Sequence, residues 1–161
     1  MARKIIALIG LLLLAGVGTM LVLTVQRAQK EQGMSEQVQS LSALTQHLGV
    51  SLAGGEEHTL IVVFNSTCEH CQWEISHLEE NRAQLAKVRL MFLSWEPEML
   101  ARDYLAEHQL EDYYMAVDED RLLTAFDGGY PQLYLYNGNE LVESFTGEVK
   151  IELLLAAMGK S

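Results

Sequence analysis

The sequence predicts an α/β domain with a central mixed sheet flanked by helices, preceded by an N-terminal transmembrane helix. From residue 59 onward, short apolar runs rich in β-branched and aromatic residues alternate with stretches of helical period. Near the N-terminus, residues 5–25 contain no charged side chain. The length of 161 residues suits one compact domain with an appendage.

The N-terminal apolar run predicts an uncleaved signal anchor over residues 1–27. A helix over residues 5–25 is about 30 Å long, enough to cross the hydrocarbon core of a bilayer. A cleaved signal peptide has a shorter apolar core followed by a small-residue cleavage site, and here the small residues lie inside the run. Arg3 and Lys4 precede the run, while Arg27 and Lys30 follow it. The positive-inside rule therefore slightly favours a cytoplasmic N-terminus and an exported domain.

The charge of the chain is unevenly distributed. Residues 1–30 carry four basic side chains and no acid, whereas residues 31–161 carry seven basic and 22 acidic side chains. A domain this acidic repels phosphate backbones, so the sequence predicts no binding to nucleic acid.

Residues 28–56 form a connector that we expect to be partly helical. Its first part is rich in Gln, Glu and Ser, and apolar residues then recur at near-helical spacing until Ala53-Gly54-Gly55 interrupts them. The recurring residues are Val38, Leu41, Leu44 and Leu48.

Residues 57–161 form the predicted α/β domain. We expect strands at 60–64, 88–94, 113–117, 132–136 and 141–145. We expect helices from Cys71 to about Leu85, from Pro97 to about His108, at 118–126 with Asp118 as N-cap, and over 151–158. Asn137-Gly138 predicts a tight hairpin between the last two strands.

The domain contains a Cys68-x-x-Cys71 pair where an apolar strand gives way to a helix, and the chain has no other cysteine. A structural zinc site needs two further ligands, and a c-type haem site needs a histidine where Gln72 stands. The strand–helix context favours a redox dithiol, which needs no cofactor beyond the Cys68–Cys71 disulfide and no metal. Two alternatives stay open: a copper- or zinc-binding protein using the cysteines and a histidine, and an interaction module whose dithiol is vestigial.

The position of each cysteine predicts its role. Cys68, at the helix start, is the expected nucleophile, because free backbone N–H groups and the helix dipole stabilise a thiolate there. Cys71, one turn later, is expected to resolve the mixed disulfide. Between them, His70 adds positive charge near the thiolate when protonated and Glu69 opposes it, so both are candidates for tuning the pKa.

Glu74 follows Cys71 by three residues and therefore lies on the same side of the helix. A partly buried carboxyl group there has a raised pKa and is able to shuttle a proton for the resolving thiol. Alternatively, Glu74 is a solvated helix residue like Glu79 and Glu80.

In combination, four segments resemble the thioredoxin superfamily, and most closely its membrane-tethered TlpA/ResA-like thiol–disulfide proteins of the bacterial envelope. They cover about residues 57–158 in the family's order and spacing. The segments are 64–74 around the cysteines, 117–126, 130–136 with Tyr130-Pro131, and Phe145-Thr-Gly147.

The resemblance implies a thioredoxin-like fold and a thiol–disulfide oxidoreductase, with reductase favoured, that acts on protein disulfides or dithiols. It also implies a cis Pro131 that faces the dithiol, substrate contact through the backbone of Tyr130, and an acid at the position of Glu74. The implied location is the bacterial inner membrane, single-pass, with the domain on the periplasmic side and a membrane or periplasmic electron donor. The sequence departs from the family at Thr67, where the usual tryptophan is missing, and at Val62, which stands in place of thioredoxin's buried acid.

Overall fold

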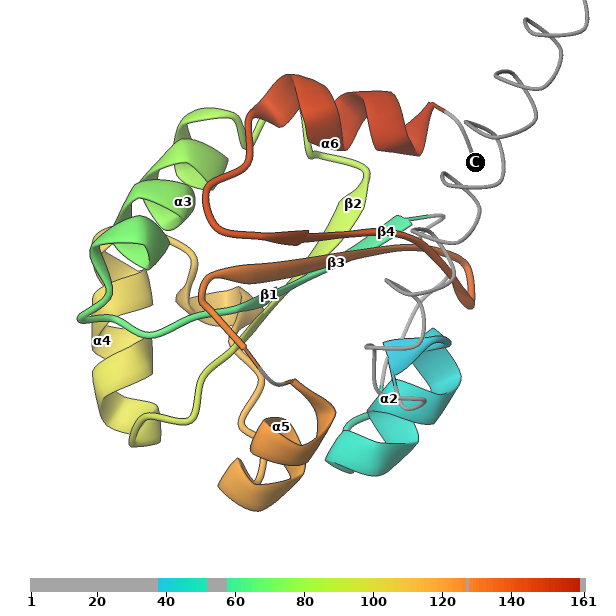
Figure 1. Cartoon of the computed structure of the whole chain (residues 1–161). Coiled ribbons are helices and arrows are strands. Elements are labelled where there is room, and N and C mark those ends of the chain that lie inside the picture. Colours follow the sequence, from blue (N-terminus) through green and yellow to red (C-terminus); the bar gives the residue numbers. More distant parts are fainter. Residues whose placement is uncertain (1–37, 52–57, 127, 160–161) are drawn as a thin grey trace, which may run out of the picture. The chain divides into compact units, whose positions relative to one another are not determined.

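The computed structural model describes residues 38–51, 58–126 and 128–159 (Figure 1). These residues belong to one compact unit, Ser35–Ser161. The predicted anchor over residues 1–27 and the interruption at residues 53–55 lie outside the described residues. Within the described ranges, no helix is both long and apolar enough to cross a membrane.

The centre of the unit is a mixed four-stranded sheet in the order β2-β1-β3-β4. Its strands are β1 (His58–Val63), β2 (Val88–Leu93), β3 (Gln132–Asn137) and β4 (Glu140–Thr146). β1 and β2 run parallel, whereas β3 is antiparallel to both β1 and β4. The carboxyl ends of β1 and β2 therefore meet the start of β3 at one end of the sheet, where Val63 pairs with both Leu93 and Gln132.

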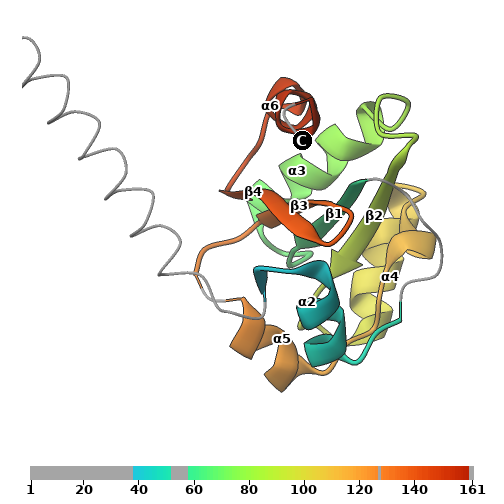
Figure 2. The same ribbon diagram turned by 90° about the vertical axis from the view of Figure 1, so that its right-hand side faces the viewer.

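Helices cover both faces of the sheet (Figures 1 and 2). Alternate side chains of the strands make one apolar cluster with α3 (Glu69–Glu80), α4 (Glu98–Glu107) and α6 (Ile151–Met158). On the other face lie α2 (Leu41–Leu48) and α5 (Glu119–Ala125), where the rings of Phe126 and Tyr134 are 5.0 Å apart. Burial on both faces explains why residues 60–63 of β1 are all apolar.

The connector helix predicted around Leu41, Leu44 and Leu48 is present as α2, and these three leucines are buried. The helix ends earlier than expected because Gly49, with φ of 72°, caps it in the left-handed region that glycine readily adopts. The hydroxyl group of Tyr136 on β3 donates a hydrogen bond to the Val38 carbonyl at 2.7 Å.

The other helices and strands predicted for the domain are present, with two corrections. The hairpin after Asn137 and the Asp118 side chain that caps α5 are as expected. α3 ends at Glu80, so residues 81–87 form turns rather than a continuation of the helix to Leu85. The strand predicted at 113–117 is wrong.

A 3₁₀ helix, η2 (Glu111–Tyr113), stands at the start of that segment, and only Tyr114 forms a β-bridge, to Phe92. Met115 N–H then donates to the Phe92 carbonyl. Because Asp118 already caps α5, too few extended residues remain between Tyr114 and Asp118 to form a ladder of hydrogen bonds with β2.

Candidate active site

The two cysteines lie where β1 passes into α3. Cys68 has extended backbone angles and forms the N-cap position of α3, so its thiol sits at the helix end that carries the free N–H groups. Cys68 is half-buried, and Cys71, one turn further along the helix, is fully buried. Both are free thiols. One cysteine therefore reaches the surface while the other is shielded behind it.

The loop before Cys68 is fixed by local hydrogen bonds. The Asn65 side-chain oxygen accepts from the Thr67 N–H at 2.9 Å, and the Asn65 carbonyl accepts from the Cys68 N–H at 3.2 Å. Asparagine is suited to such a turn because its side chain bonds to the backbone two residues later. Gln72, in the first turn of α3, donates to the Ser66 carbonyl at 2.8 Å.

Across from Cys68 lies the start of β3. The Tyr130–Pro131 peptide bond is cis, as the resemblance implies. The Cys68 sulfur points at the Tyr130 carbonyl oxygen from 3.9 Å. On the far side of the proline, the Gly147 N–H donates to the Pro131 carbonyl at 2.8 Å. The structure thus brings together residues that lie 62 positions apart in the chain.

Burial raises the pKa of the Cys71 thiol well above its usual value. A hydrogen bond with the Cys68 thiol raises it further, as do the negative charges of Cys68 and Glu96, whereas the Asn65 backbone amide lowers it. The Cys71 thiol is therefore protonated at neutral pH.

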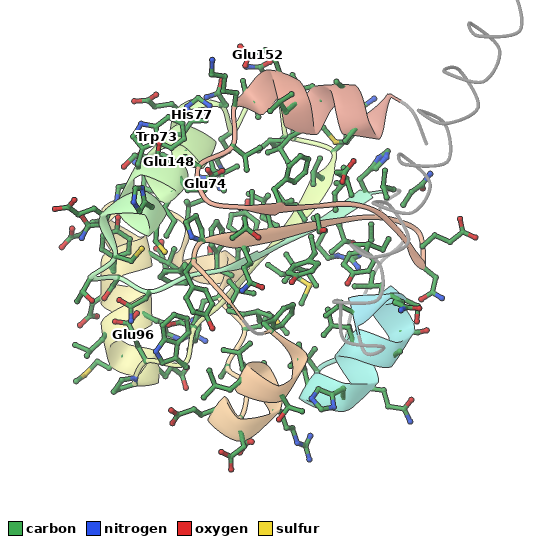
Figure 3. The ribbon with its side chains drawn as sticks, in the orientation of Figure 1. Trp73, Glu74, His77, Glu96, Glu148 and Glu152 are labelled. Carbon is green, nitrogen blue, oxygen red and sulfur yellow. The ribbon has the colours of Figure 1, made fainter. Side chains whose placement is uncertain are left out.

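Glu74 is fully buried rather than solvated, on the side of α3 that faces the chain before α6 (Figure 3). Burial raises the pKa of its carboxyl group to about 7; the hydrogen bond from the Val149 N–H, 2.7 Å from Oε2, lowers that pKa, and Glu148 raises it. The other oxygen, Oε1, is buried without a hydrogen-bond partner. Neither carboxylate oxygen of Glu74 is hydrogen-bonded to a thiol.

The two residues between the cysteines, Glu69 and His70, which are the candidates for tuning the thiol pKa, are both exposed. His70 is mostly exposed and its imidazole Nδ1 lies 2.8 Å from a Glu148 carboxylate oxygen. The charge of a protonated His70 is therefore shared with Glu148. Glu69 is exposed in the first turn of α3.

A second histidine, His77, links α3 to residues 148–151, where the chain enters α6. Its Nε2 accepts a hydrogen bond from the Ile151 N–H at 3.2 Å, and its ring stacks on Trp73 with centroids 4.7 Å apart (Figure 3). Together with His70 and Glu74, it makes three contacts at helical spacing along α3 with residues 148–151.

Sequence reasoning missed two residues of the site, Trp95 and Glu96, which follow β2. The Trp95 ring packs on Tyr130 with centroids 4.2 Å apart, and the Glu96 carboxylate accepts hydrogen bonds from the Ser66 N–H at 2.7 Å and the Ser66 hydroxyl at 2.6 Å. A signal existed: carboxyl ends of neighbouring parallel strands meet at one edge of a sheet, and Glu96 follows the strand next to β1.

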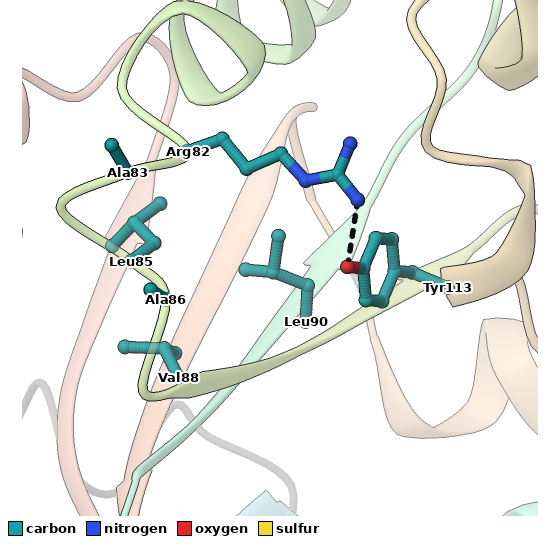
Figure 4. Close-up of a pocket in the computed structure, with 7 residues that line it drawn as sticks. All are labelled: Arg82, Ala83, Leu85, Ala86, Val88, Leu90 and Tyr113. Carbon is teal, nitrogen blue, oxygen red and sulfur yellow. Dashed lines mark hydrogen bonds between the residues drawn. The ribbon is translucent and has the colours of Figure 1, made fainter.

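The described surface also holds a pocket of about 470 Å³, lined by Arg82, Tyr113 and apolar side chains (Figure 4). Arg82 donates to the Tyr113 hydroxyl at 2.9 Å across it. The pocket includes Val88 at the start of β2, so it lies at the opposite end of the sheet from the cysteines. Among the residues that the structure describes, no three His, Cys, Asp or Glu side chains are grouped to hold a metal ion.

This architecture defines a thioredoxin-like α/β fold, with the cysteine pair at the start of a helix and a cis-proline opposite it. Similar solved structures include StoA from Bacillus subtilis, at 16% identity and a TM-score of 0.55, with 68% of this chain and 87% of that chain covered. A DsbE thiol:disulfide interchange protein from Chlorobium tepidum is 16% identical with a TM-score of 0.53, and the match covers 73% of this chain and 83% of that chain. A secreted disulfide oxidoreductase from Mycobacterium tuberculosis is 13% identical with a TM-score of 0.51, and the match covers 66% of this chain and 83% of that chain.

At these identities the likeness establishes the fold. No protein-family model matches the sequence, and no curated protein sequence matches it significantly.

Proposed function

We propose that this chain is a membrane-anchored thiol–disulfide oxidoreductase that acts, mainly as a reductase, on protein disulfides outside the cytoplasm. The observation that carries the proposal is the arrangement of Cys68. Its half-buried sulfur lies 3.9 Å from the carbonyl before a cis-proline, and a buried second cysteine lies one helical turn behind it. The likeness to solved disulfide oxidoreductases supports the same class of reaction.

The proposed reaction has two exchange steps. The Cys68 thiolate attacks one sulfur of a substrate disulfide, which forms a mixed disulfide and releases the first substrate thiolate. Cys71 then loses its proton and attacks the Cys68 sulfur, which forms the Cys68–Cys71 disulfide and releases the second substrate thiolate. The protein gives up two electrons, and an external dithiol donor reduces it again.

We assign Tyr130 and Pro131 as the residues that contact the backbone of the substrate. We assign Glu74 as the group that accepts the proton of Cys71. A pKa of about 7 suits Glu74 to this role, because a group that titrates near neutral pH both accepts and returns protons. Its unpartnered Oε1 is the free acceptor. Glu69 and His70 remain candidates for tuning the pKa of the pair.

The location rests on the sequence. The uncharged run at residues 5–25 has the length of a membrane span, and the acidic domain follows it. We therefore propose a single-pass protein of the bacterial inner membrane with its domain on the periplasmic side, served by a membrane or periplasmic electron donor.

A redox titration of the full chain tests the proposed activity. Equilibrated in glutathione or dithiothreitol buffers, the protein should form an intramolecular disulfide with one midpoint potential. A midpoint near about −270 mV marks a reductant, and one near about −120 mV an oxidant. In the Cys71→Ser variant the mixed disulfide of Cys68 should accumulate, because nothing resolves it. Absence of an intramolecular disulfide in the wild-type chain would contradict the proposal.

A further inference from the structure

One stretch of the acidic domain carries only positive charge. Residues 81–95 contain three of the seven basic side chains of residues 31–161 and none of the 22 acidic ones. Two of the three, Arg82 and Lys87, are exposed in the turns that lead from α3 into β2. These turns lie at the end of the sheet opposite the cysteines. An anion therefore meets less repulsion here than elsewhere on the acidic domain.

The pocket at this end combines apolar walls with one charged side chain (Figure 4). Its volume of about 470 Å³ is in the range of cavities that hold small organic ligands. The apolar lining is formed by Ala83, Leu85, Ala86, Val88 and Leu90. Leu85 and Leu90 belong to the buried core of the domain, so an apolar group in the pocket contacts core side chains.

Arg82 is fixed across this pocket, but its charge is not paired. Its guanidinium donates hydrogen bonds to the Tyr113 hydroxyl at 2.9 Å and to the Gln109 carbonyl at 3.1 Å, and lies 5.3 Å from the centre of the Tyr113 ring. These bonds use two of the five N–H groups that a guanidinium presents. In the part of the chain that the structure describes, no carboxylate pairs with Arg82. Three N–H groups are therefore left for an anion.

Arg102 shows a similar arrangement in which the charge is already paired. It donates to the Glu111 carbonyl at 3.3 Å and lies 5.0 Å from the centre of the Tyr114 ring. Unlike Arg82, it also donates to the Glu98 carboxylate at 2.6 Å. The comparison shows what Arg82 lacks, which is a carboxylate that accepts from its free N–H groups.

We propose that this pocket binds a small amphipathic carboxylate, that is, a carboxylic acid with an alkyl or aryl group. The carboxylate accepts hydrogen bonds from the free N–H groups of Arg82, a pairing that the planar guanidinium favours. The hydrocarbon part packs on Leu85, Val88 and Leu90. One charged lining residue matches a monoanion better than a phosphate. Because the pocket lies at the opposite end of the sheet from Cys68, the inference does not depend on the proposed redox activity.

Titration calorimetry with 3-phenylpropionate as the probe tests this binding. The full chain is held in lipid nanodiscs, and empty nanodiscs provide the reference. We expect saturable binding of one molecule per chain. Acetate lacks the apolar group and 3-phenylpropanol lacks the charge, so each should bind about tenfold more weakly or worse. Absence of saturable binding of 3-phenylpropionate, or equal affinity for either analogue, would overturn the inference.

Three variants locate the binding at the pocket. Arg82→Gln should weaken it about tenfold or more, because the charge-assisted hydrogen bonds are lost. Arg102→Gln is the matched control, which removes the same charge outside the pocket and should leave the affinity unchanged. Ala86→Phe keeps Arg82 but fills the pocket from an exposed position, and should abolish binding. Equal affinities of Arg82→Gln and Arg102→Gln would contradict the proposal. Unchanged affinity in Ala86→Phe would do the same, which keeps the test decisive if Arg82→Gln does not fold.

Discussion

At the scale of single residues, Glu74 is the most unusual group in the described part of the chain. A carboxyl group without solvent exposure normally has all its lone pairs satisfied, yet Oε1 of Glu74 has no partner and Oε2 has one backbone N–H. Burial of the charged form is unfavourable, and the pKa of about 7 expresses that cost. The folded protein therefore binds a proton at Glu74 that the unfolded chain, with an ordinary carboxyl pKa, releases.

This difference predicts how stability depends on pH. Between the ordinary value of 4.5 and the raised value of about 7, the folded state holds more protons than the unfolded state, so the free energy of unfolding falls as pH rises through this window. The total loss is up to about 3 kcal/mol. Glu74→Gln should remove this slope and be more stable than wild type at pH 8 by about 1–3 kcal/mol, less than the full amount because its buried amide lacks a partner. Urea denaturation of the wild type and of Glu74→Gln at pH 5 and pH 8 measures both the pH dependence of the free energy of unfolding and the difference in stability at pH 8.

The control is Glu80→Gln, an exposed residue on the same helix, which should change stability little at either pH. If Glu74 also accepts the proton of Cys71, Glu74→Gln should slow the resolving step and change its pH dependence. A resolving step with an unaltered pH profile would leave Glu74 as a buried structural acid.

At the scale of elements, residues 147–151 connect the two halves of the site. Gly147 donates to the carbonyl of cis-Pro131, and the residues after it contact three positions of α3. The segment thereby links the strand that faces Cys68 to the helix that carries both cysteines. Gly147 has φ of 85°, in the region that side chains with a Cβ rarely adopt.

Replacing Gly147 should therefore affect both stability and thiol exchange. In Gly147→Ala a Cβ meets no atom within 4 Å, so the cost is backbone strain alone, about 1 kcal/mol. We expect slower exchange of Cys68 with a peptide disulfide, because the strained segment no longer holds Pro131 in place. Gly138→Ala is the matched control, since Gly138 also has positive φ and open space but lies in the hairpin after β3. Equal exchange rates in the two variants, at equal loss of stability, would show that the segment does not position the site.

Sequence reasoning located the elements that carry strong local signals and failed where long-range contacts decide. The cysteine pair, the strand before it and the Asn137-Gly138 hairpin were predictable from neighbouring residues alone. The spacing from Cys71 placed Glu74 on the same side of the helix, but its full burial and its hydrogen bond from Val149, which is 75 positions away, could not be predicted from neighbouring residues. Predicting that Glu96 lies at the site required knowing that β1 and β2 are parallel neighbours in the sheet.

At the scale of the whole molecule, the chain combines a positively charged N-terminal segment with a strongly acidic remainder. Residues 1–30 carry four basic side chains, and the remaining residues carry 15 more acids than bases. Two of the basic residues, Arg3 and Lys4, precede the apolar run and two follow it, so the positive-inside rule slightly favours a cytoplasmic N-terminus. The sequence thus predicts that the residues on the two sides of the span lie in different compartments, with the dithiol outside the cytoplasm.

Because Cys68 and Cys71 are the only cysteines in the chain, a thiol-reactive label reports the compartment of the domain directly. Bacterial spheroplasts containing the full chain are reduced with a membrane-impermeant phosphine and then treated with a membrane-impermeant maleimide. We expect labelling of Cys68 in intact spheroplasts to the same extent as in lysed ones, and retention of the chain in the membrane fraction after an alkaline carbonate wash. Cys68→Ser should lose most of the label, since Cys71 is buried. Labelling that appears only after lysis would place the dithiol in the cytoplasm, and release of the chain by the wash would contradict the anchor.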